Sequence, residues 1–60
     1  MKVGDLIRDK EHPEDGTAII VEIRKGRLQP YRLYCTINSR LDWFPAHYVE
    51  KSCEVVNESG

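Results

Sequence analysis

Short runs in which apolar and polar residues alternate impose the strongest limit on how this chain can fold. The clearest runs are residues 17–25, which are rich in β-branched side chains, and residues 31–37. A period of two places successive side chains on opposite faces of a β-strand. Shorter runs of the same kind lie at 3–8, 40–44 and 49–55. Because no segment of useful length has a helical period, the five runs predict an all-β domain.

The segments between these runs carry residues that make turns or end strands. A polar loop is expected at 9–16, which contains Pro and Gly, and a tight hairpin at 38–39, which reads Asn-Ser. Pro45 ends the preceding strand because proline cannot donate a hydrogen bond to a sheet. Residues 45–48 are then long enough for a single 3-10 turn before the last strand.

Five short strands in so small a sheet would leave exposed edges unless the sheet closed on itself. We therefore predict a small five-stranded barrel over residues 1–56, followed by a disordered tail at 57–60. A chain of 60 residues buries only about 60% of its unfolded surface, and domains of this size gain stability from disulfides, metals or self-association, so its size suggests assembly.

The composition narrows the classes of partner. Hydrophobic residues make up 40% and charged residues 32% of the chain, which is typical of a globular domain. The formal net charge of −1 argues against a dedicated duplex-DNA binder. No run approaches the ~20 apolar residues that a membrane helix needs, and the first residues do not resemble a signal peptide. We therefore expect a cytoplasmic protein with no membrane partner.

The soft metal ligands and thiols are few and widely spaced. Cys35 and Cys53 form no C-x-x-C pair, so two reduced, half-buried thiols are the simplest expectation, with one internal bridge as the alternative. Zinc sites usually bring two ligands within a few residues, whereas His12 and His47 lie far from each other and from both cysteines. We therefore expect neither a metal site nor a cofactor.

Residues 43–50 read Trp-Phe-Pro-Ala-His-Tyr-Val-Glu. This stretch resembles the end of signalling SH3 domains, where an aromatic-Phe-Pro-x-x-Tyr-Val sequence closes a small barrel through a 3-10 turn. The resemblance implies that Pro45 and Tyr48 help to build a groove for proline-rich peptides, and that Phe44 and Val49 are core residues. The groove tryptophan of that family lies well upstream of the proline, whereas Trp43 lies two residues before Pro45.

A second resemblance is carried by four segments: a Gly-Asp-x-Ile-Arg-x-Lys opening at 4–10, the strand after Gly16, Tyr-x-Leu at 31–33 and Leu-Asp-Trp-Phe-Pro at 41–45. Together they resemble the small plasmid-encoded type II dihydrofolate reductases, which are SH3-like barrels that assemble as tetramers around a pore. The pore run of that family is Val-Gln-Ile-Tyr, and here Asp42 replaces the Gln and Phe44 replaces the Tyr. The same opening and strand also resemble KOW-type modules of ribosomal and transcription proteins. Gly-Asp near the start and Trp-Phe-Pro at 43–45 are similar to short proteins encoded by bacteriophages.

Alternation within 40–44 suggests where a binding surface lies. Leu41 and Trp43 share one face of the strand, and because the SH3 resemblance turns Phe44 inward, both should project outward. An exposed indole beside other apolar groups is typical of an interface; alternatively, a bulge turns Trp43 to cap one end of the barrel. The expected surface consists of Leu41, Trp43, Pro45, Tyr48 and Tyr34. Self-association is the first expectation and a different protein partner the second.

Basic residues interleaved with aromatic ones provide the runner-up hypothesis, which is weak binding of nucleic acid. The candidate contacts are Arg24, Lys25, Arg27, Arg32 and Arg40. The alternative is a solvated hairpin face. Catalysis would need a pore between subunits, in which Asp42 would be the acid with Tyr34 or Lys25 as helpers, because a barrel of this size has no deep cleft of its own. No catalytic residue is assigned to the single chain.

Overall fold

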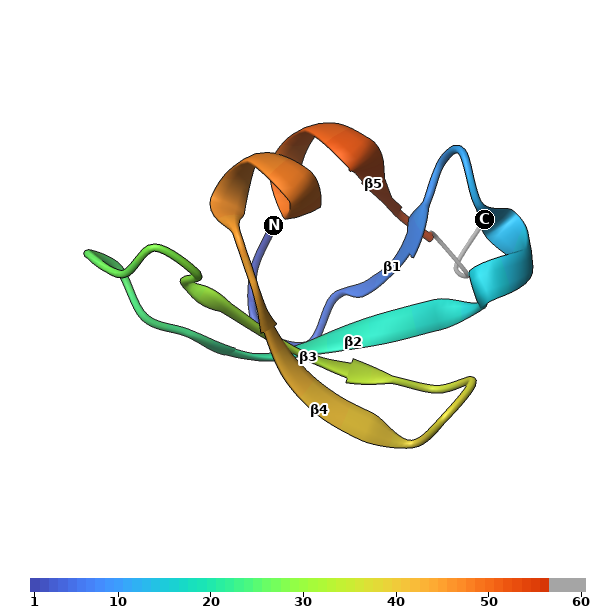
Figure 1. Ribbon diagram of the computed structural model, residues 1–60, viewed down its shortest axis with the longest axis horizontal. Helices are drawn as coiled ribbons and strands as arrows, with labels where there is room; N and C mark the ends of the chain where they lie inside the picture. Colours follow the sequence, from blue (N-terminus) through green and yellow to red (C-terminus); the bar gives the residue numbers. More distant parts are fainter. Residues whose placement is uncertain (57–60) are drawn as a thin grey trace.

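The computed structural model describes residues 1–56, in which five strands form one antiparallel sheet (Figure 1). The strands are β1 (Leu6–Asp9), β2 (Thr17–Ile23), β3 (Tyr31–Cys35), β4 (Arg40–Phe44) and β5 (Cys53–Val55). Two short helical segments are η1 (Pro13–Asp15) and η2 (Tyr48–Ser52). The prediction of an all-β chain is confirmed, and the expected tail at 57–60 lies outside the described residues.

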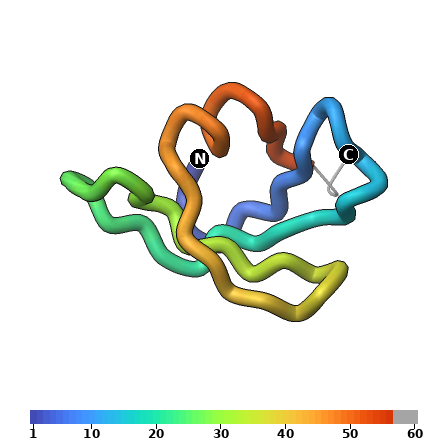
Figure 2. Tube along the Cα trace, viewed as in Figure 1, coloured from blue at the N-terminus to red at the C-terminus, as the bar shows by residue number. Residues whose placement is uncertain are grey.

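The strand order in the sheet is β4-β3-β2-β1-β5. The first four strands follow one another as a meander, and the chain then passes through η2 before β5 pairs with β1 (Figures 1 and 2). Both figures show that the sheet curls and that η2 bridges its two ends, an arrangement compatible with a small barrel. In residues 1–56, β4 and β5 occupy the two edges of the sheet.

The helical segments differ in part from the sequence-based prediction. A helical turn does precede the last strand, but it continues into the π-helical segment η2, and the amide of Val49 donates to the carbonyl of Pro45 over 3.3 Å. The described residues place the 3-10 turn in the first loop, where Pro13 starts η1. The strand predicted from residue 49 is wrong, because β5 begins only at Cys53. Val49 and Cys53 are four residues apart, a spacing that fits either a helical turn or a strand.

The core lies on one face of the sheet, under η2. Its buried residues are Ile7, Ile20, Tyr31, Leu33, Val49 and Cys53. Ala18, Ile23, Phe44, Ala46 and Tyr48 are partly buried against this cluster. Phe44 therefore points inward, as the SH3 resemblance implied. The six buried residues come from β1, β2, β3, η2 and β5, and β4 joins the core through the partly buried Phe44.

A β-bulge in β2 decides which of its residues face the core. The pairing of β2 with β3 runs regularly to Ile20 opposite Leu33 and then resumes at Glu22 opposite Arg32, so Val21 is the extra residue. Val21 is 41% exposed, whereas Ile20 is fully buried. The alternation of Ile19, Val21 and Ile23 is therefore interrupted, and Ile20 and Ile23 both contact the core.

Truncation of two adjacent residues of β2 should separate a core position from the bulge. Ile20→Ala should lower the free energy of unfolding by about 2–5 kcal/mol, because it leaves a cavity in a small core. Val21→Ala is the matched control and should change it by no more than about 0.5 kcal/mol. Urea denaturation of both variants measures the difference, and equal losses would show that the bulge is placed wrongly.

Candidate functional site

A row of apolar side chains crosses the sheet on the face opposite the core. The pairing places Leu6 opposite Ile19, Ile19 opposite Tyr34, and Tyr34 opposite Leu41. Their neighbours Ile7, Ile20 and Leu33 are buried, so these four residues point the other way. The first three are half-buried and Leu41, on the edge strand, is 48% exposed. We refer to Leu6, Ile19, Tyr34 and Leu41 as the outer row.

Trp43 lies beside the outer row and is held by two arginines. It pairs across the sheet with Arg32, which in turn pairs with Glu22. The guanidinium carbon of Arg27 lies 4.2 Å from the centroid of the indole ring, and that of Arg32 lies 5.7 Å from it. Both distances are within the range of cation–π attraction. Trp43 is half-buried and belongs to no part of the core cluster.

The charge around Trp43 is positive but partly neutralised. Glu22 forms ion pairs with Arg24 and, over 3.7 Å, with Arg32. The hydrogen bond from Arg24 lowers the pKa of the Glu22 carboxyl, so the carboxylate stays ionised. Lys25 and Arg27, in the loop between β2 and β3, make no ion pair in residues 1–56. Within the described residues, this loop therefore carries two positive charges that no ion pair neutralises.

The structure separates the five predicted basic residues into two regions. Arg24, Lys25 and Arg27 follow β2, and Arg32 reaches the same end through Trp43. Arg40 begins β4 opposite Cys35, which pairs with Ala18 at the start of β2, so Arg40 lies at the other end of the sheet from the loop after β2 (Figure 2 shows the trace). The first loop, which leads into the start of β2, carries acidic residues, so the long axis of the molecule runs from a basic end to an acidic end. The near-zero net charge conceals this polarity.

The predicted aromatic-proline surface is also divided. Leu41, Trp43 and Tyr34 share the outer face, whereas Tyr48 turns toward the inside of the curled sheet. The Tyr48 ring stacks on Phe44 with 5.6 Å between centroids, and its hydroxyl donates to Oδ2 of Asp9 over 2.9 Å. Pro45 is half-buried at the end of β4. Tyr48 therefore does not extend the surface around Leu41.

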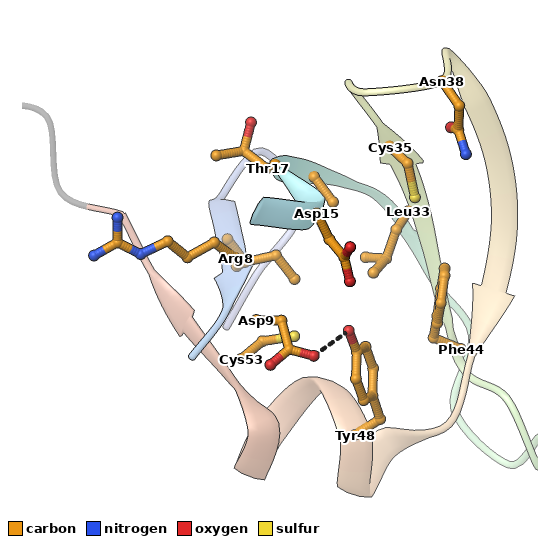
Figure 3. A pocket seen from close by; sticks show the side chains of 13 residues that line it. Arg8, Asp9, Asp15, Thr17, Leu33, Cys35, Asn38, Phe44, Tyr48 and Cys53 are labelled. Carbon is orange, nitrogen blue, oxygen red and sulfur yellow. Dashed lines mark hydrogen bonds between the residues drawn. The ribbon is translucent and has the colours of Figure 1, made fainter. Parts of the chain in front are cut away.

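Tyr48 instead forms part of the wall of a pocket of about 230 Å³ (Figure 3). Phe44 and Leu33 supply apolar wall, and Asp9 and Cys53 lie beside the Tyr48 hydroxyl. Typical sites for small organic ligands have volumes of about 300–1,000 Å³, so this pocket is small. Sequence reasoning missed it because residues 9 and 48 approach only when η2 folds over the sheet.

The Asp9 carboxylate organises the first loop and connects it to η2. Its Oδ1 accepts hydrogen bonds from the amides of Glu11 and His12, over 2.8 and 3.2 Å. The amide of Glu11 contributes most to lowering the pKa of Asp9, and the Tyr48 hydroxyl adds to it. Burial raises the pKa of Tyr48 and of Cys53, so both groups are protonated at neutral pH.

The thiols and the pore positions offer no organised reactive group. Cys35 and Cys53 are free, and burial raises the pKa of both thiols, which keeps them in the weakly nucleophilic protonated form. Asp42 is exposed at the sheet edge, and Phe44 is packed on Tyr48. Across residues 1–56, no three His, Cys, Asp or Glu side chains gather as a metal site. Over the same span, no helix has the length and apolar character to cross a bilayer.

Comparisons with protein-family models, curated proteins and solved structures found no match to this chain. The candidate site is therefore defined by geometry alone. In residues 1–56, the sheet pairing brings the half-exposed and exposed apolar side chains of the outer row together beside Trp43 and its arginines. The pocket is small, and two of its polar side chains, Tyr48 and Asp9, are hydrogen-bonded to each other.

Acidification should destabilise the wild-type protein more than the Asp9→Asn variant. The pKa of Asp9 is lower in the folded chain than in the unfolded chain, so the carboxylate stabilises the fold above the unfolded pKa. This contribution is lost as the pH falls through the folded pKa. Thermal unfolding between about pH 7 and about pH 3 should therefore show a smaller decrease in Tm for Asp9→Asn.

The exposed Asp15 in the same loop provides the control for that measurement. Asp15→Asn removes the same charge without removing the contacts to Glu11, His12 and Tyr48, so it should keep the acid sensitivity of the wild type. If Asp9→Asn and Asp15→Asn had identical pH profiles, the hydrogen bonds of Asp9 would not be what holds the loop against η2.

Proposed function

We propose that this protein is a small binding and assembly module with an SH3-like barrel fold, which docks protein through the outer row. The first partner is a second copy of the chain, and a different protein is the second. The observation that carries the proposal is the apolar row from Leu6 to Leu41, which stays partly exposed in residues 1–56 and ends in an exposed leucine. Rows of this kind on small domains mark interaction sites.

The barrel assignment draws support from the path of the chain. A four-stranded meander, a helical turn and a fifth strand that returns to β1 bring both ends of the curled sheet toward η2. The small size of the domain supports the docking role, because a core of six buried residues leaves much apolar surface outside it. Burial of part of the outer row on assembly stabilises the chain at ~25 cal/mol per Å² of apolar area.

Substitution of Leu41 should weaken self-association while leaving the fold intact. Leu41→Asp places a charge in the outer row, and Val55→Asp is the control because Val55 is 47% exposed, against 48% for Leu41, but lies in β5. In sedimentation experiments over a concentration series, Leu41→Asp should raise the dissociation constant roughly tenfold, and Val55→Asp should leave it unchanged.

Amide chemical shifts of the wild type provide an independent readout of the same surface. Raising the protein concentration should move the signals of the outer row and leave that of Ile20, on the core side, in place. Shifts confined to the pocket or to the basic end, together with equal effects of the two aspartate variants, would refute the proposed surface.

A second candidate function is weak binding of single-stranded nucleic acid at the basic end. The observation that favours it is the indole of Trp43 beside Arg27 and Arg32, with Lys25 in the same loop and without an ion pair in the described residues. An aromatic ring next to positive charge is the combination that stacks a base and contacts a phosphate. The net charge of −1 limits the expected affinity.

Arg27→Ala should reduce binding of a short labelled single-stranded oligonucleotide at low salt. The substitution removes the expected phosphate contact and the guanidinium that stacks on the indole. The slope of the logarithm of the association constant against the logarithm of the salt concentration should therefore decrease by about one. Lys51→Ala is the control, because Lys51 is equally a surface charge but lies in η2. No detectable binding by the wild type at low salt would eliminate this candidate.

A further inference from the structure

β4 is an edge strand. In an antiparallel sheet the amide and carbonyl of one residue point to one neighbouring strand and those of the next residue point to the other side. This alternation shows which main-chain groups of β4 point away from β3 and have no partner strand in residues 1–56. Ile20 donates its amide to the carbonyl of Asp5 over 3.1 Å and accepts from the amide of Gly4 over 2.8 Å, so its main chain faces β1. The neighbouring Ile19 therefore faces β3, where it is opposite Tyr34. The 3.0 Å bond from the amide of Thr36 to the carbonyl of Thr17 agrees with this, because Thr17 is two residues before Ile19 and its main chain points to the same side.

The main chain of Tyr34 is thus directed to β2, which leaves its partner on the other side, Leu41, without a hydrogen bond to β3. The amide and carbonyl of Leu41 point out of the sheet at its edge. The same holds for Trp43, two residues further along. An edge with open main-chain groups is a template for pairing with another strand.

A second copy of β4, related by a two-fold axis, could pair in three ways that place open groups opposite open groups. The axis would pass beside Leu41, beside Asp42 or beside Trp43. With the axis at Trp43, Leu41 would face the partner's Pro45, which has no amide hydrogen to donate. With the axis at Asp42, two carboxylates would face each other with their Cα atoms about 4.5 Å apart, which is destabilising.

With the axis at Leu41, the charges are complementary. Arg40 then lies opposite the partner's Asp42, and Asp42 lies opposite the partner's Arg40. Both are non-hydrogen-bonded pairs, in which directly opposite side chains approach most closely. The two leucines meet on the other face, and each is the exposed end of an outer row. Trp43 remains under Arg27 and Arg32 of its own chain.

We infer that two copies of this protein pair through β4 in antiparallel orientation, with Leu41 opposite the partner's Leu41 and two reciprocal Arg40–Asp42 pairs. This inference rests on the proposed function and specifies its first partner. The two outer rows then form one continuous row across both sheets. A charge on an edge strand normally prevents such pairing, and here the partner's Arg40 compensates Asp42.

The local geometry also sets the extent of the joint ladder. Ser39 has a φ of 57°, and Oδ1 of Asn38 accepts from the amide of Arg40, so the hairpin turn extends up to the first residue of β4. Regular pairing is therefore confined to residues 40–42 of each copy. A ladder of this length predicts a weak dimer that forms and dissociates with concentration.

Charge reversal tests the register directly. Arg40→Asp and Asp42→Arg each turn two attractive pairs into two repulsive ones, and each should raise the dissociation constant roughly tenfold or more in sedimentation equilibrium. The double variant Arg40→Asp/Asp42→Arg restores both pairs and should dimerise like the wild type. An equimolar mixture of the two single variants should also associate, because each then supplies the charge that the other lacks.

Thermal unfolding of each variant checks that the fold is intact, which is expected because both side chains are exposed. A monomeric wild type at the highest attainable concentration, a double variant as weak as the single ones, or single variants that dimerise normally would each overturn the inference. If only the charge variants failed to behave as expected while Leu41→Asp still dissociated the protein, the outer-row function would stand and the register alone would be wrong.

Discussion

Burial of Ile7, Ile20 and Leu33 on one side of the sheet is the constraint on which the other features depend. Adjacent residues of a strand point to opposite faces, so once these three face η2, their neighbours must form the outer row. The same alternation governs the main chain and leaves the amide and carbonyl of Leu41 open at the edge. Leu41 therefore belongs both to the apolar outer row and to the unpaired edge. Both properties follow from the packing of the core on the other face of the sheet.

Electrostatics divides the molecule along its long axis. The first loop is acidic and is organised by the carboxylate of Asp9, whereas the loop after β2 is basic and is anchored by Arg27, which stacks on Trp43 beside Arg32 of β3. Glu22 lies between the arginines and reduces the local charge. A single face of the sheet thus offers an apolar row for protein and, beside it, a positively charged aromatic group.

Several elements could be predicted because their determinants are local. Residues 40–44 form a strand with the expected bounds, since Pro45 cannot extend it, and Phe44 faces inward as the SH3 resemblance implied. The strand expected from residue 49 was wrong because a spacing of four residues between Val49 and Cys53 serves a helical turn as well as a strand. The bulge at Val21 had no sequence signal, because an extra β-branched residue inside a β-branched run does not disturb its composition.

By itself, the sequence determined the all-β class, the approximate strands, the shared face of Leu41 and Trp43 and the presence of basic and acidic segments, since each depends on residues close together in the chain. Only the tertiary structure decided that Tyr48 bonds to Asp9 and leaves the surface around Leu41, that Arg40 lies apart from the other basic residues, and that the outer row is continuous. These outcomes depend on strand register and on the packing of η2 over the sheet. Both join residues far apart in the chain, and their free energies come from contacts that no local pattern encodes.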